Sequence, residues 1–195
     1  KIIFSSVVPN VYKNIKRFIK KKFRIDVKEL KQIGLKKILK VDVNMKQIGS
    51  DRLANAISVI NGKDNFIILD FGTATTFDVI LKNRYKGGII APGVNLSLKT
   101  LVEKAKLIPN IRLTKIKNII GKNTQNAVRS GFYWGYQGLI ESIINLIKKK
   151  NKKNFKIIFT GGLSHLYKNT LKNRIKVDRD LTIKGLLRLI DLIWK

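Results

Sequence analysis

The stretch at residues 66–78, FIILDFGTATTFD, decides the fold class. Its apolar run ends in the carboxylate of Asp70, and a turn containing Gly72 leads into a second apolar run. The periodicity predicts strands at residues 66–71, 76–82, 87–91 and 155–160. It predicts helices at 95–105, 124–148, 164–171 and 181–194. Strands that precede and then alternate with helices indicate an α/β chain.

The region before residue 65 has a weaker pattern of the same kind. Residues 2–8 predict a buried strand ending in a turn at Pro9, and Asn10 is expected to cap a helix. The face expected for that helix comprises Val11, Ile15, Phe18 and Ile19. Short strands are expected at 23–27 and 38–43.

A further helix is expected to start at Ser50 and to end at Asn61-Gly62. Its expected buried stripe is Leu53, Ala56, Ile57 and Ile60. We expect one half of the molecule at residues 1–64, a second at 65–178, and a closing amphipathic helix at 179–195.

Composition narrows the classes of function. Among 195 residues, 41 Lys+Arg against 12 Asp+Glu give a net charge of +29. The lysines are spread among isoleucines and asparagines rather than grouped with aromatic residues, which favours a compositional bias over a nucleic-acid site. A functional anion-binding surface stays open as the alternative.

The residues that are rare or missing exclude other chemistries. No cysteine is present, which excludes disulfides, Cys-ligated zinc and thiol catalysis. The single histidine, His165, cannot build a multi-histidine metal site and is expected at the surface or at a helix start. No apolar run approaches the roughly 18 residues of a membrane span. We expect a cytoplasmic protein without a membrane partner.

Three carboxylates stand in turn-rich contexts of low charge. Asp51 lies where a helix starts, so a favourable interaction with the helix dipole is one interpretation. Asp70 precedes Gly-Thr-Ala-Thr-Thr, and such a turn suits phosphate and cation binding better than a simple turn role. Asp78, inside the next strand, is expected to be structural.

Two glycine-rich segments accompany Asp70. Residues 87–93 read GGIIAPG, and residues 160–163 read TGGL after an expected buried strand. A nucleotide commonly lies at such a position before a helix. Neither segment matches the Walker loop or the Gly-x-Gly-x-x-Gly fingerprint.

Six blocks in order make the chain resemble the type III pantothenate kinases, of the acetate-kinase, sugar-kinase, Hsp70 and actin superfamily. The blocks are SSVVP (5–9), GSDRLAN (49–55), DFGTATTFD (70–78), GGIIAPG (87–93), GKNT (121–124) and TGG (160–162). The resemblance implies a ribonuclease-H-like, actin-like ATPase fold of two similar halves, the first incomplete in this chain. It also implies a homodimer.

The resemblance assigns roles to single residues. Those assigned to pantothenate are Gly49, Ser50, Asp51, Arg52 and Thr124. Asp51 would be the general base for the hydroxyl that attacks ATP, a role that suits a carboxylate. Thr73 would touch ATP, and Asp70 would bind a monovalent cation, K+ or NH4+, in addition to Mg2+ with the nucleotide. Arg52 could hold the substrate carboxylate by a bidentate pair.

The implied reaction is the ATP-dependent phosphorylation of pantothenate to 4'-phosphopantothenate, the first step of coenzyme A biosynthesis. Phosphoryl transfer requires alignment and charge neutralisation, which these residue types supply. One alternative is a non-catalytic relative acting as a regulatory accessory or DNA-binding protein. Another is a related sugar or acyl kinase.

The chain departs from the family pattern at two places. The family's first phosphate loop, Asp-x-Gly-Asn-Thr, is not found in these residues, so we expect an upstream segment. Without it, the 195-residue chain is expected to be inactive and poorly soluble. Residues 41–46 read VDVNMK where the family carries a tyrosine and a proline that contact pantothenate.

Three glycines on the expected long helix form a further feature. Gly131, Gly135 and Gly138 lie close to one face, and each costs about 1 kcal/mol relative to alanine. They predict close packing with another helix, of the same chain or of a dimer mate.

Overall fold

The computed structural model describes residues 2–169 and 175–194. The elements before residue 60 are β1 (Ile2–Phe4), α1 (Pro9–Phe23), β2 (Val27–Glu29), β3 (Lys40–Val41) and α2 (Ser50–Val59), with short 3-10 helices at Leu30–Gln32, Leu35–Lys37 and Met45–Gln47. The later elements are β4 (Asn65–Phe71), β5 (Ala74–Leu81), β6 (Arg84–Pro92), α3 (Val94–Lys104), α4 (Thr124–Asn151), β7 (Lys156–Gly161), β8 (Ile175–Val177) and α5 (Leu181–Trp194).

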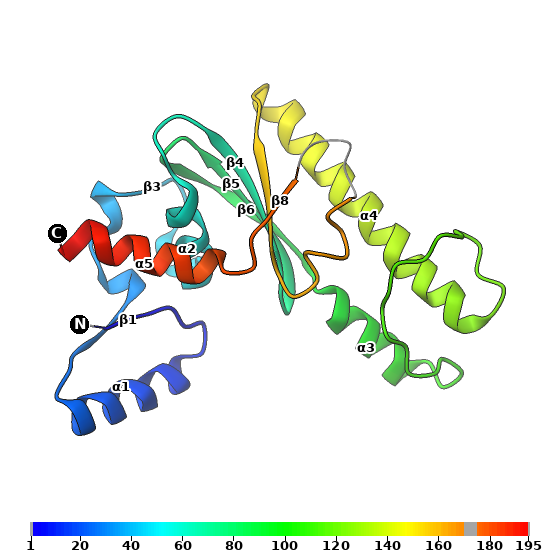
Figure 1. The fold of residues 1–195 in the computed structure, drawn as a ribbon, viewed down its shortest axis with the longest axis horizontal. Helices are drawn as coiled ribbons and strands as arrows, with labels where there is room; N and C mark the ends of the chain where they lie inside the picture. Colours follow the sequence, from blue (N-terminus) through cyan, green and yellow to red (C-terminus); the bar gives the residue numbers. More distant parts are fainter. Residues whose placement is uncertain (1, 170–174, 195) are drawn as a thin grey trace. The chain divides into compact units, whose positions relative to one another are not determined.

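Six strands form the main sheet, in the order β3-β6-β5-β4-β7-β8 (Figure 1). Residues 72–73 and 82–83 alone join β4 to β5 and β5 to β6, and connections this short require antiparallel neighbours. At the two sides of the sheet β3 runs parallel to β6, and β8 runs parallel to β7. The α/β class and the strands expected after residue 65 are confirmed.

The chain divides into two compact units, which are described separately below. The first unit contains the described residues of Lys1–Phe66, Asp78–Gly87 and Asp180–Lys195. The second contains those of Ile67–Phe77 and Gly88–Arg179. The halves predicted from the sequence, with boundaries after residues 64 and 178, stay a prediction.

Helix α5 packs directly on α2 in the first unit (Figure 1). A Cβ atom placed on Gly185 would lie 2.6 Å from the carbonyl carbon of Ala54, so glycine permits this close approach. Thr182 Oγ1 donates to Asn55 Oδ1 at 2.7 Å, and Arg188 Nη1 donates to the Ser58 carbonyl at 3.2 Å. The buried stripe expected on α2 is confirmed, because Leu53, Ala56, Ile57 and Ile60 are all buried.

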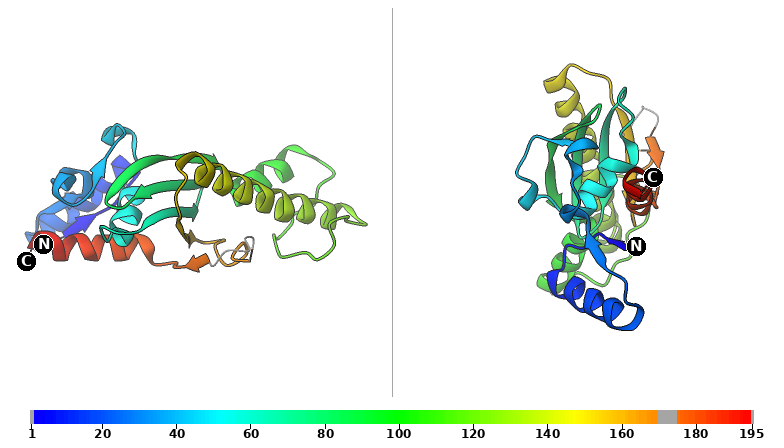
Figure 2. Two further views of the ribbon diagram at one scale, coloured as in Figure 1. Left: turned by 90° about the horizontal axis from the view of Figure 1, so that it is seen from above. Right: turned by 90° about the vertical axis from the view of Figure 1, so that its left-hand side faces the viewer.

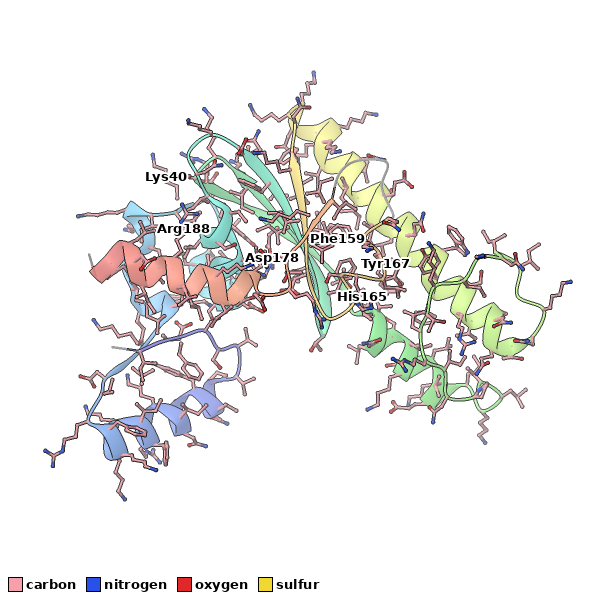
Figure 3. The ribbon with its side chains drawn as sticks, viewed as in Figure 1. Lys40, Phe159, His165, Tyr167, Asp178 and Arg188 are labelled. Carbon is pink, nitrogen blue, oxygen red and sulfur yellow. The ribbon has the colours of Figure 1, made fainter. Side chains whose placement is uncertain are left out.

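An aromatic cluster fills the core of the second unit. The ring of Phe71, at the end of β4, lies 5.2 Å from the ring of Phe159 and 5.5 Å from that of Tyr167. Tyr167 in turn stacks on Tyr133 of α4 at 5.9 Å (Figure 3 labels Phe159 and Tyr167). These contacts fix the end of β4, the strand that carries Asp70.

The start of the chain differs from the expectation for residues 2–10. Strand β1 ends at Phe4, and Val7 and Val8 are exposed. The reason is a local turn, in which the hydroxyl of Ser6 both accepts from the Val8 amide and donates to the Val8 carbonyl, each at 3.1 Å. The helix begins at Pro9 with Val8 as its cap residue, so the capping role expected for Asn10 is wrong.

The face expected to be buried on α1 is not buried. No residue of α1 is fully covered, and Val11 and Phe18 are exposed. The helix extends to Phe23 and ends at Arg24 in the left-handed conformation, so the next strand begins only at Val27. The strand expected at 38–43 is reduced to Lys40–Val41.

The helix expected at residues 164–171 is wrong for the residues described, since 162–169 form turns. Residues 170 and 171 lie outside the described residues. The hydroxyl of Ser164 donates to the Gly161 carbonyl at 2.8 Å, competing with helical hydrogen bonding at the start of this segment. His165 is exposed, as expected.

The long helix α4 leaves its glycine face open in this chain. No described atom lies within 4 Å of a Cβ placed on Gly131, Gly135 or Gly138, so close packing against the described residues of the second unit is not their reason. Residues 105–123, between α3 and α4, contain no helix or strand (Figure 2). Among the helices described, none has both the length and the apolarity needed to cross a membrane.

Candidate active site

The carboxylate of Asp51 lies across the first turn of α2. Its Oδ1 accepts the backbone N–H of Arg52 at 2.8 Å, and Gly49 is the cap residue of the helix. A Cβ atom on Gly49 would collide with Oδ1 of Asp51 and would lie 3.5 Å from Cγ1 of Val7. Glycine at position 49 therefore provides the space in which the carboxylate lies. A negative charge is also favourable at a helix N-terminus.

Ser50 joins this helix start to the loop after β1. Its side chain is buried, and its Oγ donates to the Ser6 carbonyl at 3.0 Å. The two segments SSVVP and GSDR are thus joined by a hydrogen bond between residues far apart in sequence. Because this hydroxyl already has a partner, the structure shows Ser50 fixing the helix start.

The side chain of Arg52 pairs with a buried carboxylate of β5. Its Nε donates to Oδ1 of Asp78 at 2.8 Å, and its Nη2 lies 2.7 Å from the same oxygen. Tyr85 of β6, also buried, donates its hydroxyl to this oxygen at 2.5 Å. The structural role expected for Asp78 is supported, whereas Tyr85 was missed. A tyrosine in a strand carries no sequence signal for such a contact.

Burial and charge act together on this group of three residues. Burial raises the pKa of Tyr85 well above its usual value, and the negative charge of Asp78 raises it further. Burial alone would lower the pKa of Arg52, but the charge of Asp78 and its hydrogen bond outweigh that effect and raise it. The tyrosine stays a neutral donor and the guanidinium stays charged.

Asp70 lies in the second unit, near the end of β4, beside two glycines. A Cβ atom on Gly161 would lie 2.6 Å from Oδ1 of Asp70 and 2.7 Å from the backbone nitrogen of Phe71. A Cβ atom on Gly72 would lie 3.9 Å from the same carboxylate oxygen. Gly161 has φ +84°, a left-handed conformation that favours glycine. The TGG segment thus packs its backbone closely against Asp70 and Phe71, which a residue without a side chain permits.

Thr73 is exposed in the turn between β4 and β5. Gly93, which caps α3, lies against this turn, because its Cβ would fall 2.6 Å from the carbonyl carbon of Thr73 and 2.8 Å from the Gly72 carbonyl oxygen. The neighbouring hydroxyl oxygens of Thr75 and Thr76 are buried. Of the threonines in this stretch, Thr73 is the one whose side chain is open to a ligand.

Thr124 is the first residue of α4 and is exposed. The helix is capped by Asn123, whose Oδ1 accepts the backbone N–H of Asn126 at 2.9 Å. A Cβ atom on Gly121 would lie 2.5 Å from Cα of Ala127, so the GKNT segment folds closely over this helix start.

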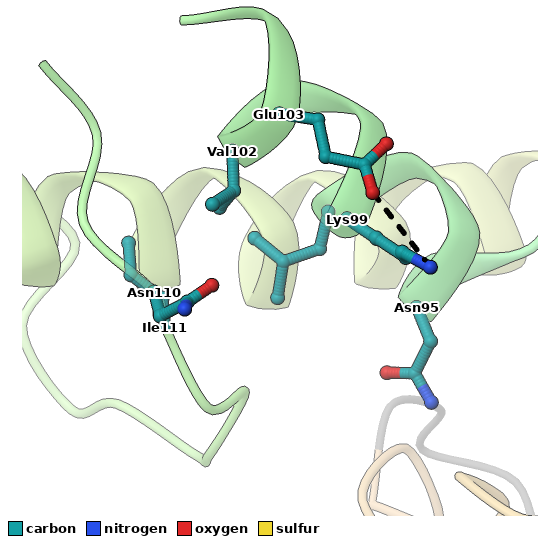
Figure 4. Close-up of a pocket in the computed structure, with 7 residues that line it drawn as sticks. Asn95, Lys99, Val102, Glu103, Asn110 and Ile111 are labelled. Atoms are coloured by element: carbon teal, nitrogen blue, oxygen red, sulfur yellow. Dashed lines mark ion pairs between the residues drawn. The ribbon is translucent and has the colours of Figure 1, made fainter. Parts of the chain in front are cut away.

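The predicted residues therefore lie at three separate places, each described within its own unit. Gly49, Ser50, Asp51 and Arg52 form the start of α2 in the first unit. In the second unit, Asp70 and Thr73 lie at the β4–β5 turn. Thr124 lies in the same unit, at the start of α4. A pocket along α3, with the ion pair Lys99–Glu103 at 3.7 Å, contains none of these residues (Figure 4).

Metal binding at Asp70 would have to use few side chains. In residues 2–169 and 175–194, no group of three or more His, Cys, Asp or Glu side chains could hold a metal ion. A cation at Asp70 would therefore be completed by backbone oxygens, water or phosphate, a donor set that hard cations accept. The Asp70 carboxylate, near the end of β4 and close to the backbone of Gly72 and Gly161, is the anionic side chain that such a site would use.

Comparisons with known proteins agree with the six blocks. A family model described as Type III pantothenate kinase matches residues 1–146. A type III pantothenate kinase of Pelagibacter ubique (strain HTCC1062) is 60% identical over 193 residues, covering 99% of this chain and 78% of the relative. That of Roseobacter denitrificans is 39% identical over 193 residues, covering 95% of this chain and 73% of the relative.

Solved structures show the same fold at low identity. A protein of Campylobacter jejuni described as a Baf family transcriptional activator has a TM-score of 0.68 at 22% identity, covering 98% of this chain and 82% of that one. A protein of Sinorhizobium meliloti described as a 2-dehydro-3-deoxygalactonokinase has a TM-score of 0.53 at 12% identity, covering 74% of this chain and 59% of that one. At these identities the likeness concerns the fold, which is ribonuclease-H-like.

Proposed function

The chain belongs to the type III pantothenate kinase family, and from this premise we propose that it transfers the γ-phosphoryl group of ATP to the hydroxyl of pantothenate. The product is 4'-phosphopantothenate, and the reaction is the first step of coenzyme A biosynthesis. The observation that carries the proposal is the 60% identity to a type III pantothenate kinase over nearly the whole chain. The alternative of a non-catalytic regulator is not favoured.

We assign the general base to Asp51. Its carboxylate is held at a helix start by the Arg52 amide, and Gly49 leaves the space that this carboxylate occupies. A carboxylate in such a position can accept the proton of a substrate hydroxyl as the hydroxyl attacks phosphorus. We assign Gly49 to this pantothenate site and the buried Ser50 to holding its helix start, whereas the pantothenate contact expected for Thr124, in the second unit, stays a prediction. Arg52 supplies the positive charge for the substrate carboxylate.

We assign ATP to the glycine-lined turn of the second unit. Thr73 is exposed there and can donate to a phosphate oxygen, and Gly161 lets its backbone approach Asp70 closely. Asp70 would hold a monovalent cation, K+ or NH4+. When bound, this cation and Mg2+ offset the negative charge of the triphosphate.

The reaction can be tested directly by an assay of the full-length protein. Labelled pantothenate should be phosphorylated with ATP, whereas a panel of sugars and short acyl acids should not be. Phosphorylation of a sugar or acyl acid in preference to pantothenate would move the chain to a related kinase. Salt-sensitive DNA binding without any kinase activity would restore the regulatory alternative.

Asp70→Asn is expected to abolish activation by K+ or NH4+ and to raise the KM for ATP. The substitution keeps the shape of the side chain next to Gly161 but removes the anionic ligand. Initial rates measured across a series of monovalent chlorides compare the variant with the parent. An unchanged response to these salts in the variant would place the cation elsewhere.

We further propose a homodimer with α4 at its interface. The open face at Gly131, Gly135 and Gly138 would let a second helix approach closely. Light scattering on the full-length protein gives the particle mass, and a monomer mass at micromolar concentration would contradict the proposal.

A further inference from the structure

One oxygen atom of Asp78 is shared by two side chains of the first unit. Oδ1 accepts Nε of Arg52 at 2.8 Å and the hydroxyl of Tyr85 at 2.5 Å, and Nη2 of Arg52 lies 2.7 Å away. Asp78 is fully buried, and the Arg52 side chain is 13% exposed. A charged hydrogen bond buried in this way is both strong and specific in direction.

This arrangement fixes which part of Arg52 remains for a ligand. Two of the three guanidinium nitrogens, Nε and Nη2, face Asp78. The end of the group that carries Nη1 is therefore the part left for a second carboxylate. The side-on edge, which combines Nε and Nη2 and is often used for bidentate pairing, faces Asp78, and because Nη2 is buried this edge is not open to a second carboxylate.

Arg52 also holds the carboxylate of Asp51, the proposed general base. The backbone N–H of Arg52 donates to Oδ1 of Asp51 at 2.8 Å. A shift of Arg52 would thus disturb both a charged side chain and the carboxylate one residue before it. The buried Oδ1 of Asp78, on strand β5, fixes the position of the Arg52 side chain.

We propose that Asp78 and Tyr85 are positioning residues that hold the Arg52 guanidinium end-on toward the carboxylate of pantothenate, and so set the preference for a carboxylate substrate. The inference rests on the proposed function. Tyr85 adds a donor without adding charge, so it orients the Asp78 carboxylate while the ion pair stays balanced. Neither residue needs to touch the substrate.

The decisive measurement is a ratio between two substrates. The second substrate is the alcohol analogue of pantothenate, in which CH2OH replaces the carboxylate. Full-length parent protein should prefer pantothenate in kcat/KM. In Asp78→Asn this preference should fall by about tenfold or more, through a higher KM for pantothenate, because a hydrogen bond between charged groups is weakened. Tyr85→Phe should lower the same preference for pantothenate by a few-fold.

A purely structural role would give a different result. Damage to the fold lowers kcat/KM for both substrates alike and leaves their ratio unchanged, which would overturn the inference. The KM for ATP should stay near the parental value in both variants. Thermal unfolding shows whether each variant is folded at the assay temperature.

A double-mutant cycle tests whether Asp78 acts through Arg52. In a protein that already carries Arg52→Lys, the further change Asp78→Asn should have little additional effect on the substrate ratio. Independent, additive losses would contradict action through Arg52.

Matched controls use the same chemical changes elsewhere in the first unit. Tyr12→Phe removes a hydroxyl whose contacts are 3.4 Å long, and Asp26→Asn removes an exposed carboxylate. Both should keep the parental ratio. If the parent protein phosphorylates the alcohol analogue and pantothenate with equal kcat/KM, only the inference is overturned. If it phosphorylates neither, the proposed function is overturned and the inference with it.

Discussion

Asp51→Asn in the full-length protein is expected to lower kcat for pantothenate phosphorylation by about 10² to 10⁴-fold, which corresponds to about 3–5 kcal/mol in the barrier. Asparagine has the shape of aspartate but cannot accept the hydroxyl proton. Its side-chain oxygen can still accept the Arg52 amide, as Oδ1 of Asp51 does at 2.8 Å. The variant therefore removes the base and keeps the helix start.

The stability of this variant provides the control. Loss of a negative charge in the first turn of a helix costs about 0.3–1 kcal/mol, far less than the expected loss in the barrier. Initial-rate kinetics are compared with ATP binding and with thermal unfolding of the same preparation. Retention of more than a tenth of the parental kcat would show that another group accepts the proton.

Local patterns predicted the elements whose signals lie close together in sequence. Strands β4 to β6 were recognisable because their apolar runs are separated by short turns rich in glycine or asparagine. The buried stripe of α2 follows from its spacing, and the stripe is buried because α5 packs on α2.

Local reasoning failed where a hydroxyl competes with regular secondary structure. Ser6 closes a turn on Val8 and shortens β1, and Ser164 donates to the Gly161 carbonyl where a helix was expected. On α1 the apolar spacing was correct for a helix but could not show that its face stays uncovered.

The site residues were recognised from ordered blocks, but their geometry was not. Glycine is needed at position 161 because this residue closely approaches Asp70, about ninety residues earlier in the chain. Hydrophobic periodicity reports local secondary structure and cannot predict a contact between residues so far apart. Tyr85 was missed for the same reason, since its contact with Asp78 depends on how two strands pair. The roles of Asp51, Asp70, Thr73 and Thr124 remain proposals.

Gly161→Ala is expected to destabilise the protein by about 2–4 kcal/mol, the range typical of a clash in a closely packed site. The residue has φ +84°, a conformation that costs an L-residue about 1–2 kcal/mol. In addition, the new Cβ would lie 2.6 Å from the Asp70 carboxylate and 2.7 Å from the backbone oxygen of Phe71. Relief would require Phe71 to move, but its ring is packed against Phe159 and Tyr167.

Gly162→Ala is the matched control for this prediction. It makes the same chemical change one residue later, where no described atom lies within 4 Å of the new Cβ and φ is not in the left-handed range. Its free energy of unfolding, measured with urea, should stay within about 0.5 kcal/mol of the parent. Because Asp70 moves with the clash, Gly161→Ala should also weaken the response to K+, while Gly162→Ala tests whether a methyl group in this turn is harmful in itself. Equal stabilities of the two variants would show that the close approach of Gly161 to Asp70 and Phe71 does not constrain the fold.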